Sequence, residues 1–168
     1  GSFNIYNEIT YLWETDKIPM PGSYKGNLLK NYFMNVLGLH YRFDNSLQIT
    51  AEYLFNGLGD SNNLDAANIR YKNGLSSSLN KHIIGISLNY EFNPLLIGNY
   101  DSKIAWEDSS NQHNLSLTKS ISDNIDFIVG SEINIGDRPN GSNWQNPNLQ
   151  SEFGRHTNTY YLKFNCYF

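Results

Sequence analysis

Apolar and polar residues alternate with a period of two along most of this chain. Such alternation is typical of a β-strand with one apolar and one polar face. The last segment shows it clearly, because Tyr160, Leu162 and Phe164 fall on one face and Tyr161 and Lys163 on the other. The pattern recurs in the ranges 3–14, 32–43, 47–56, 81–92, 96–107, 115–121, 125–135 and 160–168. The chain is therefore predicted to be an all-β protein of about eight strands.

The connections between these segments alternate in length. Short connections are expected at 44–46, 93–95 and 122–124. Long ones are expected at 15–30, 57–80 and 136–157, with a connection of intermediate length at 107–113. A Greek-key sandwich gives no reason for this regularity. Outer-membrane barrels, by contrast, have short periplasmic turns and long outer loops around an up-and-down meander.

Aromatic residues gather at both ends of the apolar stripe, and aliphatic residues lie between them. The aromatic residues at the short-turn end are Tyr41, Phe43, Tyr90, Phe92 and Phe168, and those at the long-loop end are Tyr11, Trp13, Phe55 and Trp106. This is the pattern of two aromatic girdles around a lipid-facing band. Because every backbone amide in lipid must be paired, a spanning sheet has to close. We therefore predict a closed antiparallel up-and-down transmembrane β-barrel.

Composition restricts the alternatives. The 168 residues suffice for a single domain, 1–168, and the opening Gly1-Ser2 resembles a cloning scar. A net charge of −4 gives no indication of a nucleic-acid partner. The single cysteine excludes an internal disulfide and a multi-cysteine metal site. No apolar run approaches the roughly 18 residues of a spanning helix.

The C-terminal strand resembles the signal by which assembly machinery reads bacterial outer-membrane proteins. The residues that carry this resemblance are Tyr160, Leu162, Phe164 and the terminal Phe168. It implies a location in the outer membrane of a Gram-negative bacterium, with the lipid bilayer and that machinery as partners. A second stretch, LSLTKSISDNIDFIVGSEINIGDRP followed by SEFGR and YYLKFNCYF, resembles the last hairpins of larger porin-like barrels. The segments are therefore either a whole barrel or part of a larger one.

The polar stripe is expected to face the lumen and to carry a network of charges. Its members are Glu8, Arg42, Glu52, Lys81, Glu91, Asp101, Lys103, Glu132 and Lys163. The interior of an eight-stranded barrel is just wide enough for side chains to fill, which predicts a plugged lumen with paired charges. In a wider barrel the same stripe would line water. Acids outnumber bases on it, so such a pore is expected to prefer cations.

Candidate catalytic groups are scattered through the polar loops. His113 or His156 could combine with Glu107, Asp108 or Asp137, but their spacing does not favour a catalytic group. We therefore expect no enzyme activity, no cofactor and no metal site. Three functions stay open: a porin-like outer-membrane protein with a filled lumen, a passive porin or a fragment of one, and a structural or adhesive barrel acting through its outer loops. The sequence leaves the oligomeric state open.

Overall fold

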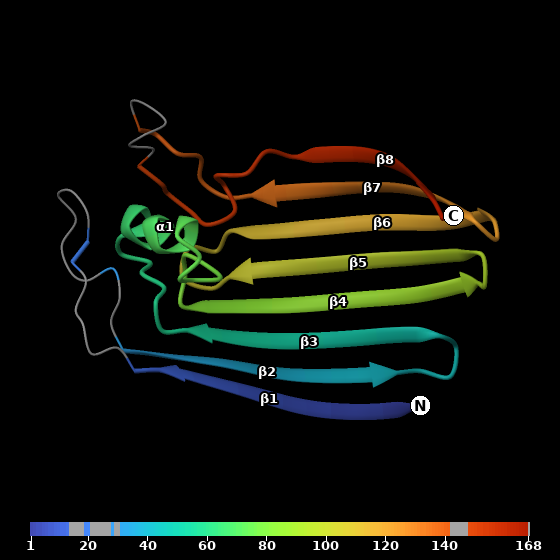
Figure 1. Ribbon diagram of the computed structural model, residues 1–168, viewed down its shortest axis with the longest axis horizontal. Helices are drawn as coiled ribbons and strands as arrows, with labels where there is room; N and C mark the ends of the chain where they lie inside the picture. The colour runs from blue at the N-terminus through green and yellow to red at the C-terminus, as the bar shows by residue number, and fades with distance from the viewer. Residues whose placement is uncertain (14–18, 21–27, 29–30, 142–147, 168) are drawn as a thin grey trace.

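The computed structural model describes residues 1–13, 19–20, 28, 31–141 and 148–167. These residues form one antiparallel sheet of eight strands, with one helix beside it (Figure 1). The strands are β1 (Ser2–Leu12), β2 (Tyr32–Arg42), β3 (Leu47–Asn56), β4 (His82–Asn93), β5 (Leu96–Ala105), β6 (Asn111–Ser122), β7 (Ile125–Ile135) and β8 (Thr159–Cys166). Each strand pairs with its neighbours in the sequence, so the predicted meander is confirmed.

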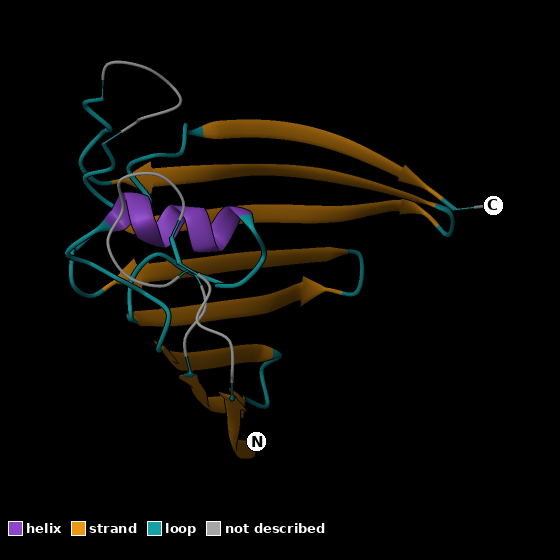
Figure 2. Ribbon diagram, turned by 60° about the vertical axis from the view of Figure 1, so that its left-hand side comes forward, coloured by secondary structure: helices purple, strands orange, loops and turns teal. Residues whose placement is uncertain are grey.

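The predicted closure into a barrel is wrong. The strand order runs from β1 to β8, and no pairing joins β1 to β8 among the described residues. The sheet is curved but open, as Figure 2 shows. The prediction of a plugged lumen depended on closure, so it is not supported either. Alternation of residue types determines which side chains share a face, whereas closure depends on what each outermost strand meets at its free edge.

The strands have the predicted two faces. On β2, Leu37 and Leu39 lie on the apolar face and are exposed, while His40 lies on the polar face. The strand β6 begins at Asn111, earlier than the expected segment 115–121, because polar residues interrupt its apolar stripe. The pairing shifts by one residue between Glu91 and Asn93 and between Ser120 and Ser122, at the ends of the two hairpins β4–β5 and β6–β7.

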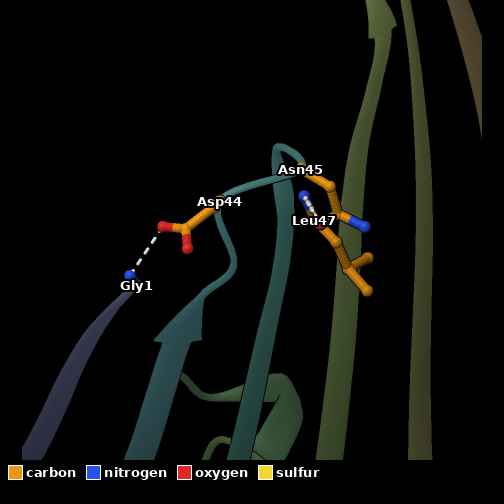
Figure 3. Close-up of polar contacts among 4 residues, drawn as sticks. All are labelled: Gly1, Asp44, Asn45 and Leu47. Atoms are coloured by element: carbon orange, nitrogen blue, oxygen red, sulfur yellow. Dashed lines mark hydrogen bonds and ion pairs between the residues drawn. The ribbon is translucent and has the colours of Figure 1, made fainter.

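The first tight turn links three strands. In the turn between β2 and β3, the side-chain oxygen of Asn45 accepts a hydrogen bond from the backbone N–H of Leu47, at 3.3 Å. The amino group of Gly1 contacts the Asp44 carboxylate at 2.7 Å (Figure 3). The start of β1 is thereby held against this turn. An asparagine oxygen that accepts a hydrogen bond two residues on is a common way to stabilise such turns.

The helix α1 (Leu64–Lys72) lies in the long connection expected at 57–80, where no helix was predicted. Asn63 caps it, because its side-chain oxygen accepts a hydrogen bond from the N–H of Ala66 at 3.1 Å. Asp65 in the first turn and Arg70 in the last turn match the helix dipole. Among the described residues, no helix is long and apolar enough to cross a bilayer.

The best-buried apolar residues lie in the loops at one end of the sheet. Leu64, Ala67, Leu79 and Leu149 form one cluster between α1 and the segment that precedes β8. A second cluster joins Phe153 from that segment to the polar face of the sheet; its other members are Ile83 and Ala105, with Leu54 packed against them. The loops therefore fold over the end of the polar face.

Candidate functional site

The polar face of the sheet is built from rows of hydrophilic side chains. The register places seven polar residues in one row across β1 to β7: Asn4, His40, Thr50, Ser87, Asp101, Asn114 and Glu132. The next row, nearer the loops, contains Tyr6, Gly38, Glu52, Gly85, Lys103, Gln112 and Asn134. A hydrophobic core would place apolar side chains here, so this face is suited to contact with water.

The opposite face is apolar and exposed. Among its residues, Ile9 is 63% exposed, Leu162 is 67% exposed and Phe164 is 68% exposed. Near the short turns, Tyr41 packs edge-on against Phe43, with ring centroids 4.5 Å apart, and Tyr90 packs in the same way against Phe92 at 4.8 Å. An exposed apolar surface of this extent indicates contact with a membrane or with another protein.

A pocket of about 380 Å³ lies between the polar face and the folded loops. We call it the loop–sheet pocket. Its floor includes Glu52, Gly85 and Lys103, and its roof includes Phe153 and Arg155. It is of the size that small-molecule sites commonly have.

A buried carboxylate fixes the roof of this pocket. Glu152 is 4% exposed, and it accepts hydrogen bonds from the backbone N–H groups of Leu79 at 3.1 Å and Asn80 at 2.9 Å. Burial raises the pKa of Glu152, while its N–H donors and nearby Arg155 limit the rise by stabilising the carboxylate. Asp108 accepts hydrogen bonds from the Asn80 side chain and from the N–H of Glu152, both at 2.7 Å. Three loop segments are thus joined into one unit.

Arg155 is held at the pocket by neutral partners. Its guanidinium donates to Asn68 on α1 at 2.8 Å and to a ring nitrogen of His156 at 3.1 Å, and it lies 4.5 Å from the centre of the Tyr71 ring. Desolvation, followed by the charge of Arg155, lowers the pKa of His156, so this imidazole is neutral at pH 7. In the described part of the chain, no carboxylate forms an ion pair with Arg155.

The residues of the predicted lumen network lie along the polar face. Asp101 and Glu132 share one row, and Glu52 and Lys103 share another. Of the remaining members, Glu8 and Lys163 lie near the middle of β1 and β8. Arg42 and Glu91 lie near the short-turn ends of β2 and β4, and Lys81 directly precedes β4. Within the described ranges the one ion pair is Gly1–Asp44, so the structure does not bring the acids and bases of this network into contact.

The residues of the predicted assembly signal fall on the apolar face of β8. Tyr160, Leu162 and Phe164 alternate with Tyr161 and Lys163, as predicted. Phe168 lies outside the described residues.

The candidate catalytic residues are not brought together. His113 lies on the apolar face, where its ring stacks on Tyr100 and hydrogen-bonds the Tyr100 hydroxyl at 2.8 Å. Asp108 takes part in the loop network, and His156 contacts Arg155. Among the described residues, no three side chains of the His, Cys, Asp and Glu types gather into a metal site.

Comparison with protein-family models, curated proteins and solved structures found no match. The features of the molecule that bear on its function are the two faces of the sheet and the loop–sheet pocket. Sequence reasoning missed Arg155, Glu152 and the role of Gly85. Asn63 followed by Asp65 was a local sign of a helix start. The position of Gly85 had no such local sign, because only the strand register places it between Glu52 and Lys103.

Proposed function

We propose that this chain forms part of the wall of a porin-like passive channel in the bacterial outer membrane. The observation that carries the proposal is the contrast between the faces of one open sheet. Ile86 and Leu117 belong to an exposed apolar face, whereas Ser87 and Asn114 belong to a hydrophilic one. A soluble protein would bury the apolar face, while a channel wall presents it to lipid and turns the polar face toward water.

The open edges favour a wall segment over a self-contained small protein. Among the described residues, β1 pairs only with β2, and β8 pairs only with β7. An unpaired backbone group in the hydrocarbon region costs several kcal/mol. Each edge therefore requires a further strand in the membrane, supplied by a longer form of this chain or by other copies of it. A wall of more than eight strands encloses a wider interior, which can hold water.

The side chains of the polar face favour a passage for cations. Within the strands, this face carries six acidic residues: Glu8, Glu52, Glu91, Asp101, Asp126 and Glu132. It carries three basic ones: Arg42, Lys103 and Lys163. Rings of carboxylates attract cations and exclude anions from a narrow aqueous path.

Planar-bilayer recording of the purified protein in a KCl gradient tests this proposal. We expect stable conductance steps whose reversal potential indicates a preference for K⁺ over Cl⁻. Replacing Asp101 and Glu132 together by Asn and Gln should reduce that preference, because both carboxylates lie in one row of the polar face. Asp123→Asn, in the turn between β6 and β7, is the matched control and should leave the preference unchanged.

Two results would contradict the proposal. One is the absence of conductance steps from protein that has inserted into the bilayer. The other is a channel that prefers anions.

A further inference from the structure

In the floor of the loop–sheet pocket, a glycine lies between two residues of opposite charge. The register pairs Glu52 with Gly85 and Gly85 with Lys103, so the two charged residues lie on β3 and β5 with β4 between them. Two strand spacings amount to about 9.6 Å between their backbones. Within the described residues, Glu52 and Lys103 form no ion pair with each other.

Gly85 leaves the floor of the pocket open. A Cβ atom at this position would meet only the Glu52 side chain, at 3.8 Å from its Cβ and 3.9 Å from Oε2. The space between the two charges is therefore not taken by a neighbouring side chain. By contrast, a Cβ at Gly38 in the same row would overlap the ring of Tyr6.

On one side of the gap, a hydrogen bond fixes the orientation of the Glu52 carboxylate. The hydroxyl of Tyr6 donates a hydrogen bond to Oε1 of Glu52, while Oε2 borders the space above Gly85. This oxygen is placed to accept a hydrogen bond from an ammonium group.

The opposite side of the pocket is cationic, and its wall is apolar. Lys103 rises from the sheet, and Arg155 is held over the pocket by Asn68, His156 and Tyr71. The Glu152 carboxylate also lines the pocket, but its two oxygens accept hydrogen bonds from the backbone N–H groups of Leu79 and Asn80. Lys103 and Arg155 therefore supply the cationic contacts on this side, and they suit a carboxylate, since charge-assisted hydrogen bonds are the stronger kind. The apolar part of the lining consists of Val36, Leu54, Ile83 and Phe153.

We propose that the loop–sheet pocket is the selective binding site of the channel, for zwitterions whose ammonium and carboxylate groups are separated by an apolar chain. The ammonium contacts Glu52, the carboxylate contacts Lys103 and Arg155, and the chain lies along Phe153. In an α-amino acid both charges sit on one carbon atom, so it cannot reach both sides of the gap. The inference rests on the proposed function only in taking the pocket to lie on the path through the channel.

Two isomers provide the sharpest probe. 6-Aminohexanoate and norleucine have the same composition and net charge, and they differ in the distance between their charges. Calorimetry on the protein in detergent should give saturable binding of 6-aminohexanoate and an affinity for norleucine lower by about tenfold or more, because norleucine loses one charged contact. Hexanoate and hexylamine, each with one charge, should bind as weakly as norleucine.

Three variants test the named residues. Glu52→Gln and Lys103→Gln should each weaken 6-aminohexanoate binding by about tenfold, since each removes one charged contact. Gly85→Leu should abolish binding while both charges stay, because its side chain fills the gap. Ser87→Leu, two residues along β4 and outside the pocket, and Lys72→Gln, on α1, are the matched controls and should bind normally. Far-UV circular dichroism checks that each variant is folded.

The outcomes separate this inference from the proposed function. Equal affinity for the two isomers, normal binding by folded Gly85→Leu, or no saturable binding by the unmodified protein would overturn the inference, even if the protein conducts. Binding as described in a protein that inserts but does not conduct would refute the channel and leave the binding site standing.

Discussion

Leu39→Arg will destabilise the protein in lipid vesicles, lowering its free energy of unfolding by about 2–4 kcal/mol. This is the range measured for a cationic side chain at the bilayer midplane. Leu39 lies near the middle of β2, between Ile5 and Ala51 on the apolar face, and it is 43% exposed. If this face meets hydrocarbon, the new guanidinium loses its hydration without gaining a partner. Urea titration of the protein folded in vesicles, followed by tryptophan fluorescence, measures the loss.

Ser87→Arg is the matched control for this substitution. Ser87 lies in the adjacent row of the sheet, at nearly the same depth, but on the polar face between Thr50 and Asp101. Its replacement should cost little, because the guanidinium reaches water and faces a carboxylate. Equal losses from the two variants would contradict the assignment of the two faces.

Gly38→Val will disrupt the pairing of β1 with β2. The ring of Tyr6 lies directly over Gly38, and any Cβ at this position would overlap it. Overpacking of this kind costs about 1–3 kcal/mol. Displacing the ring also breaks its hydrogen bond to the Glu52 carboxylate, and bonds to charged groups contribute about 1.5–3 kcal/mol. The expected total loss, measured by the same urea titration, is therefore about 2.5–6 kcal/mol.

Two other variants separate the effect of overpacking from the effect of the lost hydrogen bond. Tyr6→Phe removes the hydrogen bond and keeps the packing, so it should cost only about 1.5–3 kcal/mol. Gly85→Ala, in the same row, places a methyl group in ordinary van der Waals contact with the Glu52 side chain. It should not destabilise the protein, because glycine is itself unfavourable within a strand. If Gly38→Val proves no more destabilising than Gly85→Ala, Tyr6 does not occupy the site described.

A second Tyr–Gly pair lies near the other edge of the sheet. The ring of Tyr161 on β8 covers Gly130 on β7, where a Cβ would overlap it. Each outermost strand is therefore locked to its inner neighbour by a tyrosine on the polar face. This arrangement strengthens the pairing next to both open edges.

Local patterns predicted the strands, because alternation is a property of consecutive residues. The segments around Leu39 and Leu162 follow a period of two, and both lie in strands as predicted. Closure could not be predicted in this way. The alternation in β1 and β8 is the same whether their free edges meet each other or meet further strands, so the sequence pattern does not distinguish the two cases.

The loops were the least predictable part. The stretch 64–72 has no apolar stripe of helical period. Its burial comes from contacts with Leu79, which follows soon after the helix, and with Leu149, which is distant in sequence. The loop–sheet pocket depends on similar long-range contacts. Glu152 reaches the N–H groups of Leu79 and Asn80 across more than seventy residues of chain.

The most direct test of the central claim is a spin-label scan along β4 of the protein in lipid vesicles. Cys166, the single cysteine, is first replaced by serine, and labels are placed singly at residues 84 to 89. We predict that labels at Ile84, Ile86 and Leu88 collide with oxygen dissolved in the lipid, while labels at Gly85, Ser87 and Asn89 collide with a water-soluble nickel complex. Oxygen and nickel accessibility that do not alternate along β4, or an apolar face that the nickel complex reaches as readily as the polar face, would contradict the claim that this sheet separates lipid from water.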